Sequence, residues 1–131
     1  MNYVTGLGGV FFKTKDKKKL LAWYQEHLGI EADEYGSKSF MWREESGEKA
    51  FSVWSPFKDE SDYFDPSEQP FMVNFRVRDL DGLLEHLKSK GVDQVGGIEE
   101  YPFGRFAWIL DPEGIKIELW EPTEVVPGNA C

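Results

Sequence analysis

The sequence predicts an α+β fold in which two similar modules form one domain, with facing mixed sheets around a central cavity. Its 131 residues are a typical length for a single domain. Strand-like and helix-like segments follow one another in the same order in the two halves of the chain. Because a small sheet cannot bury both of its faces alone, we expect the halves to pack against each other.

The first module is expected over residues 4–56. It begins with a Gly-rich, apolar strand at 4–14. Apolar residues at helical spacing predict a helix over 15–28, with Asp16 as its N-cap and Gly29 as the residue that ends it. Two further strands, at 39–44 and 50–55, flank a turn in which Gly47 supplies a positive φ.

The second module, residues 71–122, repeats this order after an acidic, proline-bounded linker over 57–70. Its first strand, at 71–77, leads into a helix that begins at Asp79 and ends at Gly91. A terminal hairpin follows, with strands at 106–110 and 115–120. We expect the linker to close over the cavity mouth through Tyr63 and Phe64, and residues 123–131 to form a frayed tail.

Individual residues recur at a nearly constant spacing, which indicates an internal repeat. Phe12 recurs as Phe75 at an offset of 63, whereas Trp54 recurs as Trp120 at an offset of 66. The larger offset is explained by a longer loop in the second half. The repeat therefore predicts that Trp54 and Trp120 occupy matched positions in the two modules.

Composition excludes several classes of function. A formal net charge of −9 disfavours binding to nucleic acid and to anionic membrane surfaces. The single cysteine, Cys131, excludes an internal disulfide and a thiolate metal cluster. The chain has neither a signal-peptide pattern nor an apolar run approaching the ~20 residues of a membrane span, so we expect a cytoplasmic protein.

The segment GRFAWILDPEGIKIELWEP at 104–122 resembles the closing hairpin of the vicinal oxygen chelate superfamily, which includes glyoxalase I, bleomycin-resistance proteins and extradiol dioxygenases. WYQEHLG at 23–29 is similar to the first helix of that family. The resemblance covers residues 4–122. It implies one glyoxalase-like domain of two tandem βαβββ modules and a homodimer, but it does not identify the reaction, because the superfamily spans several chemistries.

The metal ligands of the family are largely missing. The resemblance places the four ligand positions at Gly9, Ser52, Met72 and Glu118, and only Glu118 has a side chain that binds metal ions well. Both histidines, His27 and His86, fall on predicted helices and not on cavity strands. We therefore expect no cofactor. A divalent metal would need a non-standard site centred on Glu118, completed by Glu121 or by ligands from across a dimer interface, and an extradiol dioxygenase is disfavoured.

Strand alternation predicts which side chains face the cavity. The candidate ligand-binding residues are Phe11, Ser52, Trp54, Met72, Asn74, Arg76, Glu118 and Trp120. Three alternatives remain for Glu118: a solvated carboxylate, an ion pair with Arg76 inside the cavity, or a catalytic role as a general base. Trp54 and Trp120 are equally well explained as core residues that the fold requires.

Three functions are compatible with these features. The first is a bleomycin-resistance-like protein that binds a small organic ligand, aromatic or anionic, without the usual metal set. The second is a lyase or isomerase of glyoxalase I type with a non-standard metal site centred on Glu118. The third is a non-catalytic interaction module, which predicts a cavity filled by side chains.

Overall fold

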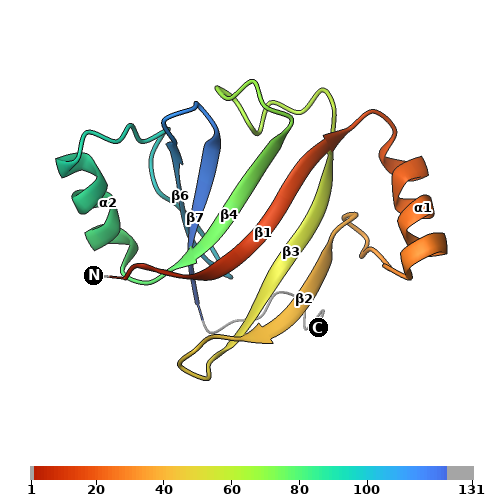
Figure 1. Cartoon of the computed structure of the whole chain (residues 1–131), viewed down its shortest axis with the longest axis horizontal. Coiled ribbons are helices and arrows are strands. Elements are labelled where there is room, and N and C mark those ends of the chain that lie inside the picture. The colour runs from red at the N-terminus through yellow and green to blue at the C-terminus, as the bar shows by residue number, and fades with distance from the viewer. Residues whose placement is uncertain (1, 124–131) are drawn as a thin grey trace.

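The computed structural model describes residues 2–123, and these form a curved sheet with two helices (Figure 1). The α+β class is thus confirmed. Cys131 and most of the expected tail lie outside the described residues. The elements, in chain order, are β1 (Val4–Thr14), α1 (Lys17–Leu28), β2 (Lys38–Arg43), β3 (Lys49–Lys58), β4 (Phe71–Val77), α2 (Leu80–Ser89), β5 (Glu99–Tyr101), β6 (Gly104–Leu110) and β7 (Lys116–Pro122).

All seven strands belong to one mixed sheet with the order β2-β3-β1-β4-β7-β6-β5. In each half, the first strand pairs in parallel with the last, β1 with β3 and β4 with β7. The antiparallel β1–β4 ladder joins the halves, so the surfaces that face the cavity are two parts of one continuous sheet. The first half has two strands after its helix and the second half has three.

The two helices begin at the caps that the sequence predicts. The carboxylate of Asp16 accepts a hydrogen bond from the backbone N–H of Lys19, and Gly29 ends α1 in the left-handed conformation. Asp79 accepts from the N–H of Gly82 at the start of α2, whose C-cap is Lys90. Within the described residues, neither helix is long and apolar enough to cross a membrane.

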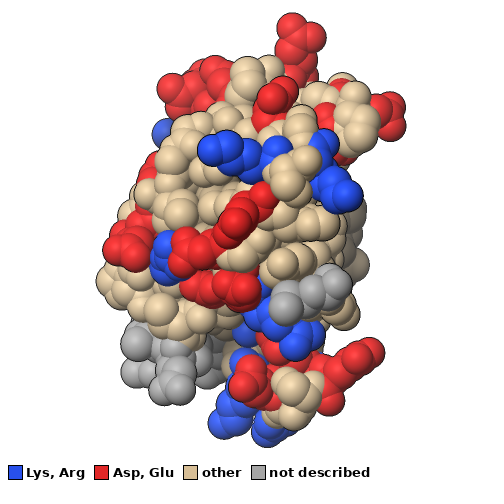
Figure 2. All heavy atoms as spheres, turned by 90° about the vertical axis from the view of Figure 1, so that its left-hand side faces the viewer, with Lys and Arg blue, Asp and Glu red and all other residues tan. Residues whose placement is uncertain are grey.

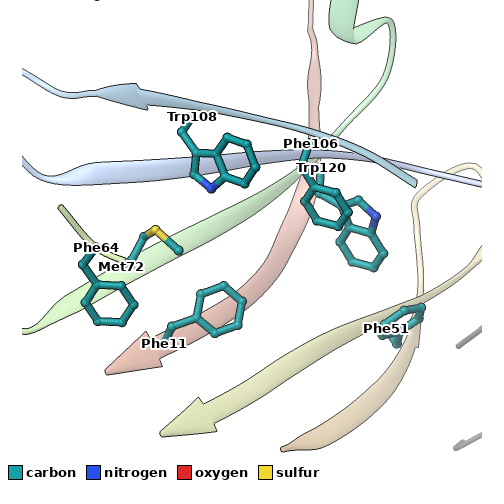
Figure 3. Packing of buried hydrophobic residues seen from close by; sticks show 7 residues of the cluster. All are labelled: Phe11, Phe51, Phe64, Met72, Phe106, Trp108 and Trp120. Carbon is teal, nitrogen blue, oxygen red and sulfur yellow. The ribbon is translucent and has the colours of Figure 1, made fainter. Parts of the chain in front are cut away.

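The two faces of the sheet are covered differently. Aliphatic side chains of α2, among them Leu80 and Leu83, pack on the outer face of the second half. An aromatic cluster lies on the inner, concave face (Figure 3) and consists of Phe11, Phe51, Phe64, Met72, Phe106, Trp108 and Trp120.

On the side of the molecule that carries α2, acidic and basic side chains are interspersed (Figure 2).

The β1–β3 and β4–β7 ladders are related by an offset of 63 in residue number. Phe11 pairs with Ser55 in the first half, and adding this offset to both gives Asn74 and Glu118, which pair in the second half. The offset of 66 between the tryptophans therefore differs from the structural register by three. Because three is odd, it places the matched residues on opposite faces of the sheet.

Trp54 accordingly points away from the cavity, contrary to the prediction. Its ring contacts Phe12 and Tyr24, with centroids 5.6 and 4.6 Å apart, on the outer face beneath α1. Trp120 faces inward and packs against Phe51. Trp54 is therefore a packing residue that holds α1 on the sheet.

We expect Trp54→Ala to lower the free energy of unfolding by about 2 kcal/mol, because half-buried aromatic contacts are lost. Urea denaturation followed by far-UV circular dichroism measures this. Trp23→Ala is the matched control: Trp23 lies on α1 but is 49% exposed, so its loss is expected to cost less than about 0.5 kcal/mol. Equal effects in the two variants would contradict the assigned role of Trp54.

Candidate functional site

A cavity of about 370 Å³ opens on the concave face of the sheet. Its walls are mostly aromatic, and the rings that line it are those of Phe11, Phe51, Tyr63, Tyr101, Phe103, Phe106 and Trp120. Polar groups enter at two places: Asp33 and Ser37 from the segment between α1 and β2, and Asn74 with Glu118 from the paired strands β4 and β7. The site is thus an aromatic pocket with one buried polar end.

Four of the eight predicted ligand-binding residues line this cavity: Phe11, Asn74, Glu118 and Trp120. Met72 is fully buried within the aromatic cluster that supports the wall. Ser52 does not line the cavity, because its hydroxyl donates to the carbonyl of Leu7 and accepts from the indole N–H of Trp42. On β3 the inward positions are Phe51 and Val53, one residue away from those expected.

Arg76 does not line the cavity, because its side chain is already bound by other residues beside it. Its guanidinium forms an ion pair with Glu44 at 3.0 Å and lies over the rings of Trp42 and Trp120. The predicted Arg76–Glu118 pair is therefore wrong. The carboxylate of Glu44, which follows β2 directly, binds this cation instead.

Glu118 is surrounded by hydrogen-bond donors from three separate segments. Oε1 accepts from the Asn74 side-chain amide at 2.5 Å, and Oε2 accepts from the Trp108 indole N–H at 2.9 Å. The phenol of Tyr63 also donates to Oε2. Glu118 is only 3% exposed, so these donors replace the water that a carboxylate normally holds.

Burial is the largest cause of the pKa shifts of Glu118, Tyr63 and Lys116. It raises the pKa of Glu118 above its ordinary value, although the donors from Tyr63, Asn74 and Trp108 oppose the shift. Burial and the neighbouring Glu118 charge together raise the pKa of the Tyr63 phenol. Burial lowers the pKa of Lys116, whose ammonium donates to the Tyr63 carbonyl at 2.6 Å.

The linker between the halves, which begins after β3 ends at Lys58, supplies Tyr63 and Phe64, but these lie at the inner end of the cavity and not over its mouth as predicted. Phe64 is fully buried in the aromatic cluster, and the Tyr63 ring stacks on Phe57. Two polar contacts reinforce this position, from Tyr63 to Glu118 and from Lys116 to Tyr63. The segment therefore covers one side of the cavity through both apolar and charged contacts.

Gly8 is a site residue that the sequence reasoning missed. A Cβ at this position would lie 2.0 Å from the side-chain oxygen of Asn74, so only glycine leaves room for that amide. The Asn74 side-chain oxygen is itself buried without a hydrogen-bond partner. The run of glycines at 6, 8 and 9 was the available signal, because close approach to a strand backbone requires residues without a side chain.

The donor set does not fit a divalent metal. Of the four expected ligand positions, Gly9, Ser52 and Met72 bring no charged ligand, and N–H and O–H donors surround the oxygens of Glu118. Among residues 2–123, no group of three or more His, Cys, Asp or Glu side chains is arranged to hold an ion. His27 lies on α1 and stacks on Trp23, and His86 lies on α2.

The curved sheet and its concave pocket define a class of small α+β proteins built from two related halves. Residues 6–119 match the family described as "Glyoxalase/Bleomycin resistance protein/Dioxygenase superfamily", and the chain belongs to it. No curated protein matches the chain significantly.

Solved structures with low sequence identity share the fold. Methylmalonyl-CoA epimerase from Mycobacterium tuberculosis is 23% identical, with a TM-score of 0.58 over 94% of this chain and 91% of that one. The Streptomyces coelicolor epimerase in complex with 2-nitronate-propionyl-CoA is 15% identical, with a TM-score of 0.65 over 92% and 99%. A superfamily member from Vibrio splendidus 12B01 is 10% identical, with a TM-score of 0.57 over 88% and 98%.

We expect Glu118 to titrate above the ordinary range of a glutamate, because burial disfavours its charged form. Tyr63→Phe should raise its pKa further, since a donor that stabilises the carboxylate is lost. Carbon-13 NMR of the labelled glutamate side chain measures both values. Tyr101→Phe, which removes a phenol bonded to Glu99, is the control and should leave Glu118 unchanged. An ordinary pKa for Glu118 would contradict the assignment.

Proposed function

We propose that this protein binds a flat, aromatic small molecule in the cavity on the concave face of its sheet. The observation that carries the proposal is the composition of the wall, in which seven rings surround about 370 Å³ of space. Such a cavity has the size of a ligand pocket, and its polar groups are few and grouped. Glu118, Tyr63 and Asn74 would orient the ligand by hydrogen bonds at the inner end.

Of the two ligand types considered from the sequence, the aromatic one fits this lining better. The charged side chains in the wall, Asp33 and Glu118, are both acidic and would repel an anion. The solved neighbour in complex with an organic ligand, 2-nitronate-propionyl-CoA, supports a small-molecule partner in general terms. It does not specify the ligand of this chain, because the likeness is one of fold.

The two other functions receive less support. A lyase or isomerase of glyoxalase I type would need a metal centred on Glu118, and the donors around that carboxylate do not fit one. An interaction module without a ligand predicts that side chains fill the space between the strands, whereas the cavity is open. A homodimer and a cytoplasmic location stay as expectations from the family resemblance and the sequence.

Thermal-shift measurements against a library of aromatic metabolites test the proposal. We expect several flat, uncharged aromatics to raise the melting temperature and to quench the tryptophan fluorescence, because Trp120 lines the cavity. If no compound in the library raises the melting temperature, the proposal is overturned.

Tyr101→Ala should weaken the binding of such a ligand about fivefold, because one ring of the cavity rim is lost. Tyr101 is 48% exposed, so its removal should leave the stability nearly unchanged. Tyr35→Ala is the matched control, since Tyr35 is 77% exposed and lies outside this cavity. Equal affinities for the two variants would place the ligand elsewhere.

A further inference from the structure

We propose that the ligand of this cavity is an organic cation, an aromatic ring that carries a protonated amine, with the ring against the aromatic wall and the ammonium group directed toward Glu118. This inference rests on the proposed function and names the class of ligand that the same site selects. Three observations support it. The charged residues that line the cavity are acidic, aromatic rings on the concave face lie against Lys116 and Arg76, and the buried side-chain oxygen of Asn74 has no hydrogen-bond partner.

The charges that line the cavity have a single sign. Asp33 lies at the mouth and Glu118 at the inner end, and no lysine or arginine belongs to the described lining. The chain as a whole has a formal net charge of −9, so its long-range field also attracts cations. A neutral ligand would gain less from these charges than a cation, and an anion would be repelled.

Aromatic rings on the concave side of the sheet already make cation–π contacts with Lys116 and Arg76. The ammonium of Lys116 lies 5.3 Å from the ring centre of Tyr63 and 5.7 Å from that of Trp108. The guanidinium of Arg76 lies 5.1 Å from the ring centre of Trp120. Ring faces attract cations through their electron density. The rings at the mouth, such as Tyr101 and Phe103, offer the same surface to a ligand.

Three cations of the protein lie near the aromatic cluster without lining the cavity. Lys116 donates to the Tyr63 carbonyl, and its charge also acts on Glu118. Arg76 is paired with Glu44, and Lys13 lies 5.6 Å from the ring centre of Phe64. The proposed cation would therefore share the Glu118 charge with Lys116 and meet Asp33 at the mouth.

One buried polar atom in the cavity wall also lacks a donor. The Asn74 side chain lines the cavity, the residue is 2% exposed, and its oxygen has no hydrogen-bond partner. Its amide nitrogen is used by Glu118. Unsatisfied buried acceptors are rare and costly. An ammonium group brings several N–H donors; in this proposal it donates to the Glu118 carboxylate and, once the Asn74 side chain shifts from its packed position beside Gly8, to this oxygen as well.

The binding of such a cation is expected to depend on pH. Burial favours the neutral form of Glu118, whereas an ammonium group favours the carboxylate, so binding should release a proton at low pH. The other titratable groups that interact with Glu118 are Tyr63, Lys116 and Tyr101. Asp62, Asp65 and Glu99 act in turn on Lys116. Affinity for the cation should therefore rise with pH, and affinity for a neutral analogue should not.

Three probes of similar size and different charge test the inference: benzylamine as its ammonium ion, benzyl alcohol, and benzoate. Each is titrated into the full chain and followed by calorimetry and by amide chemical shifts of the cavity residues. We expect benzylammonium to bind about tenfold more tightly than benzyl alcohol, and benzoate to bind most weakly. Calorimetry in two buffers of different ionisation enthalpy measures the released proton.

Glu118→Gln and Asp33→Asn should each reduce the preference for benzylammonium over benzyl alcohol. Asp33→Asn keeps an oxygen for the backbone N–H groups of Tyr35 and Ser37, so it tests the charge even if Glu118→Gln does not fold. Glu34→Gln, at an exposed position outside the lining, is the matched control and should leave the preference unchanged.

The outcomes separate the two proposals. If benzyl alcohol or benzoate binds as tightly as benzylammonium, the inference of a cationic ligand is overturned while the aromatic pocket stands. If none of the three probes binds in the cavity, and the aromatic library also fails to stabilise the protein, the proposed function falls together with the inference.

Discussion

Burial of the Glu118 carboxylate is the constraint on which the concave face depends. A buried carboxylate without partners costs several kcal/mol, so its position requires donors. The chain supplies them from three places: Tyr63 in the linker, Asn74 on β4 and Trp108 on β6. One carboxylate on β7 thereby fixes the linker and two neighbouring strands relative to each other. The inner end of the cavity is consequently preorganised before any ligand arrives.

The rest of the cavity follows from the way the two halves meet. The β1–β4 ladder pairs Gly9 with Asn74 and Phe11 with Met72, and the offset that relates the halves exchanges these two pairs. Such a relation is that of a local two-fold axis between the halves. The halves are nevertheless unequal at the site: the residue that corresponds to Glu118 is Ser55, whose hydroxyl bonds to Ser37. The buried charge at the inner end belongs to the second half, whereas the first half contributes Asp33 at the mouth.

The sequence was sufficient to predict the fold class and both helix N-caps, because these depend on local patterns. It also identified Tyr63 and Phe64 as contacts of the linker, but it placed them at the mouth and not at the inner end of the cavity. Four of the eight predicted ligand-binding residues do not line the cavity, and one register error accounts for two of them, Ser52 and Trp54. Aligning Trp54 with Trp120 gives an offset of 66, whereas the hydrogen-bonded strands keep 63. Side chains alternate along a strand, so an error of three moved Ser52 and Trp54 to the cavity side. Sequence similarity between repeats does not by itself determine strand pairing.

The partners of charged side chains were harder to predict, because they join segments far apart in the chain. Arg76 has the parity of a cavity residue, yet Glu44 binds it and the indole rings of Trp42 and Trp120 cover it. With this arginine engaged outside the cavity, Glu118 is left to donors that carry no charge of their own. Gly9, Ser52 and Met72, where the resemblance leads us to expect metal ligands, carry no charge, and Glu118 is the principal buried charge in the lining of the aromatic pocket. A site with that composition is suited to recognising a ligand by charge and ring stacking.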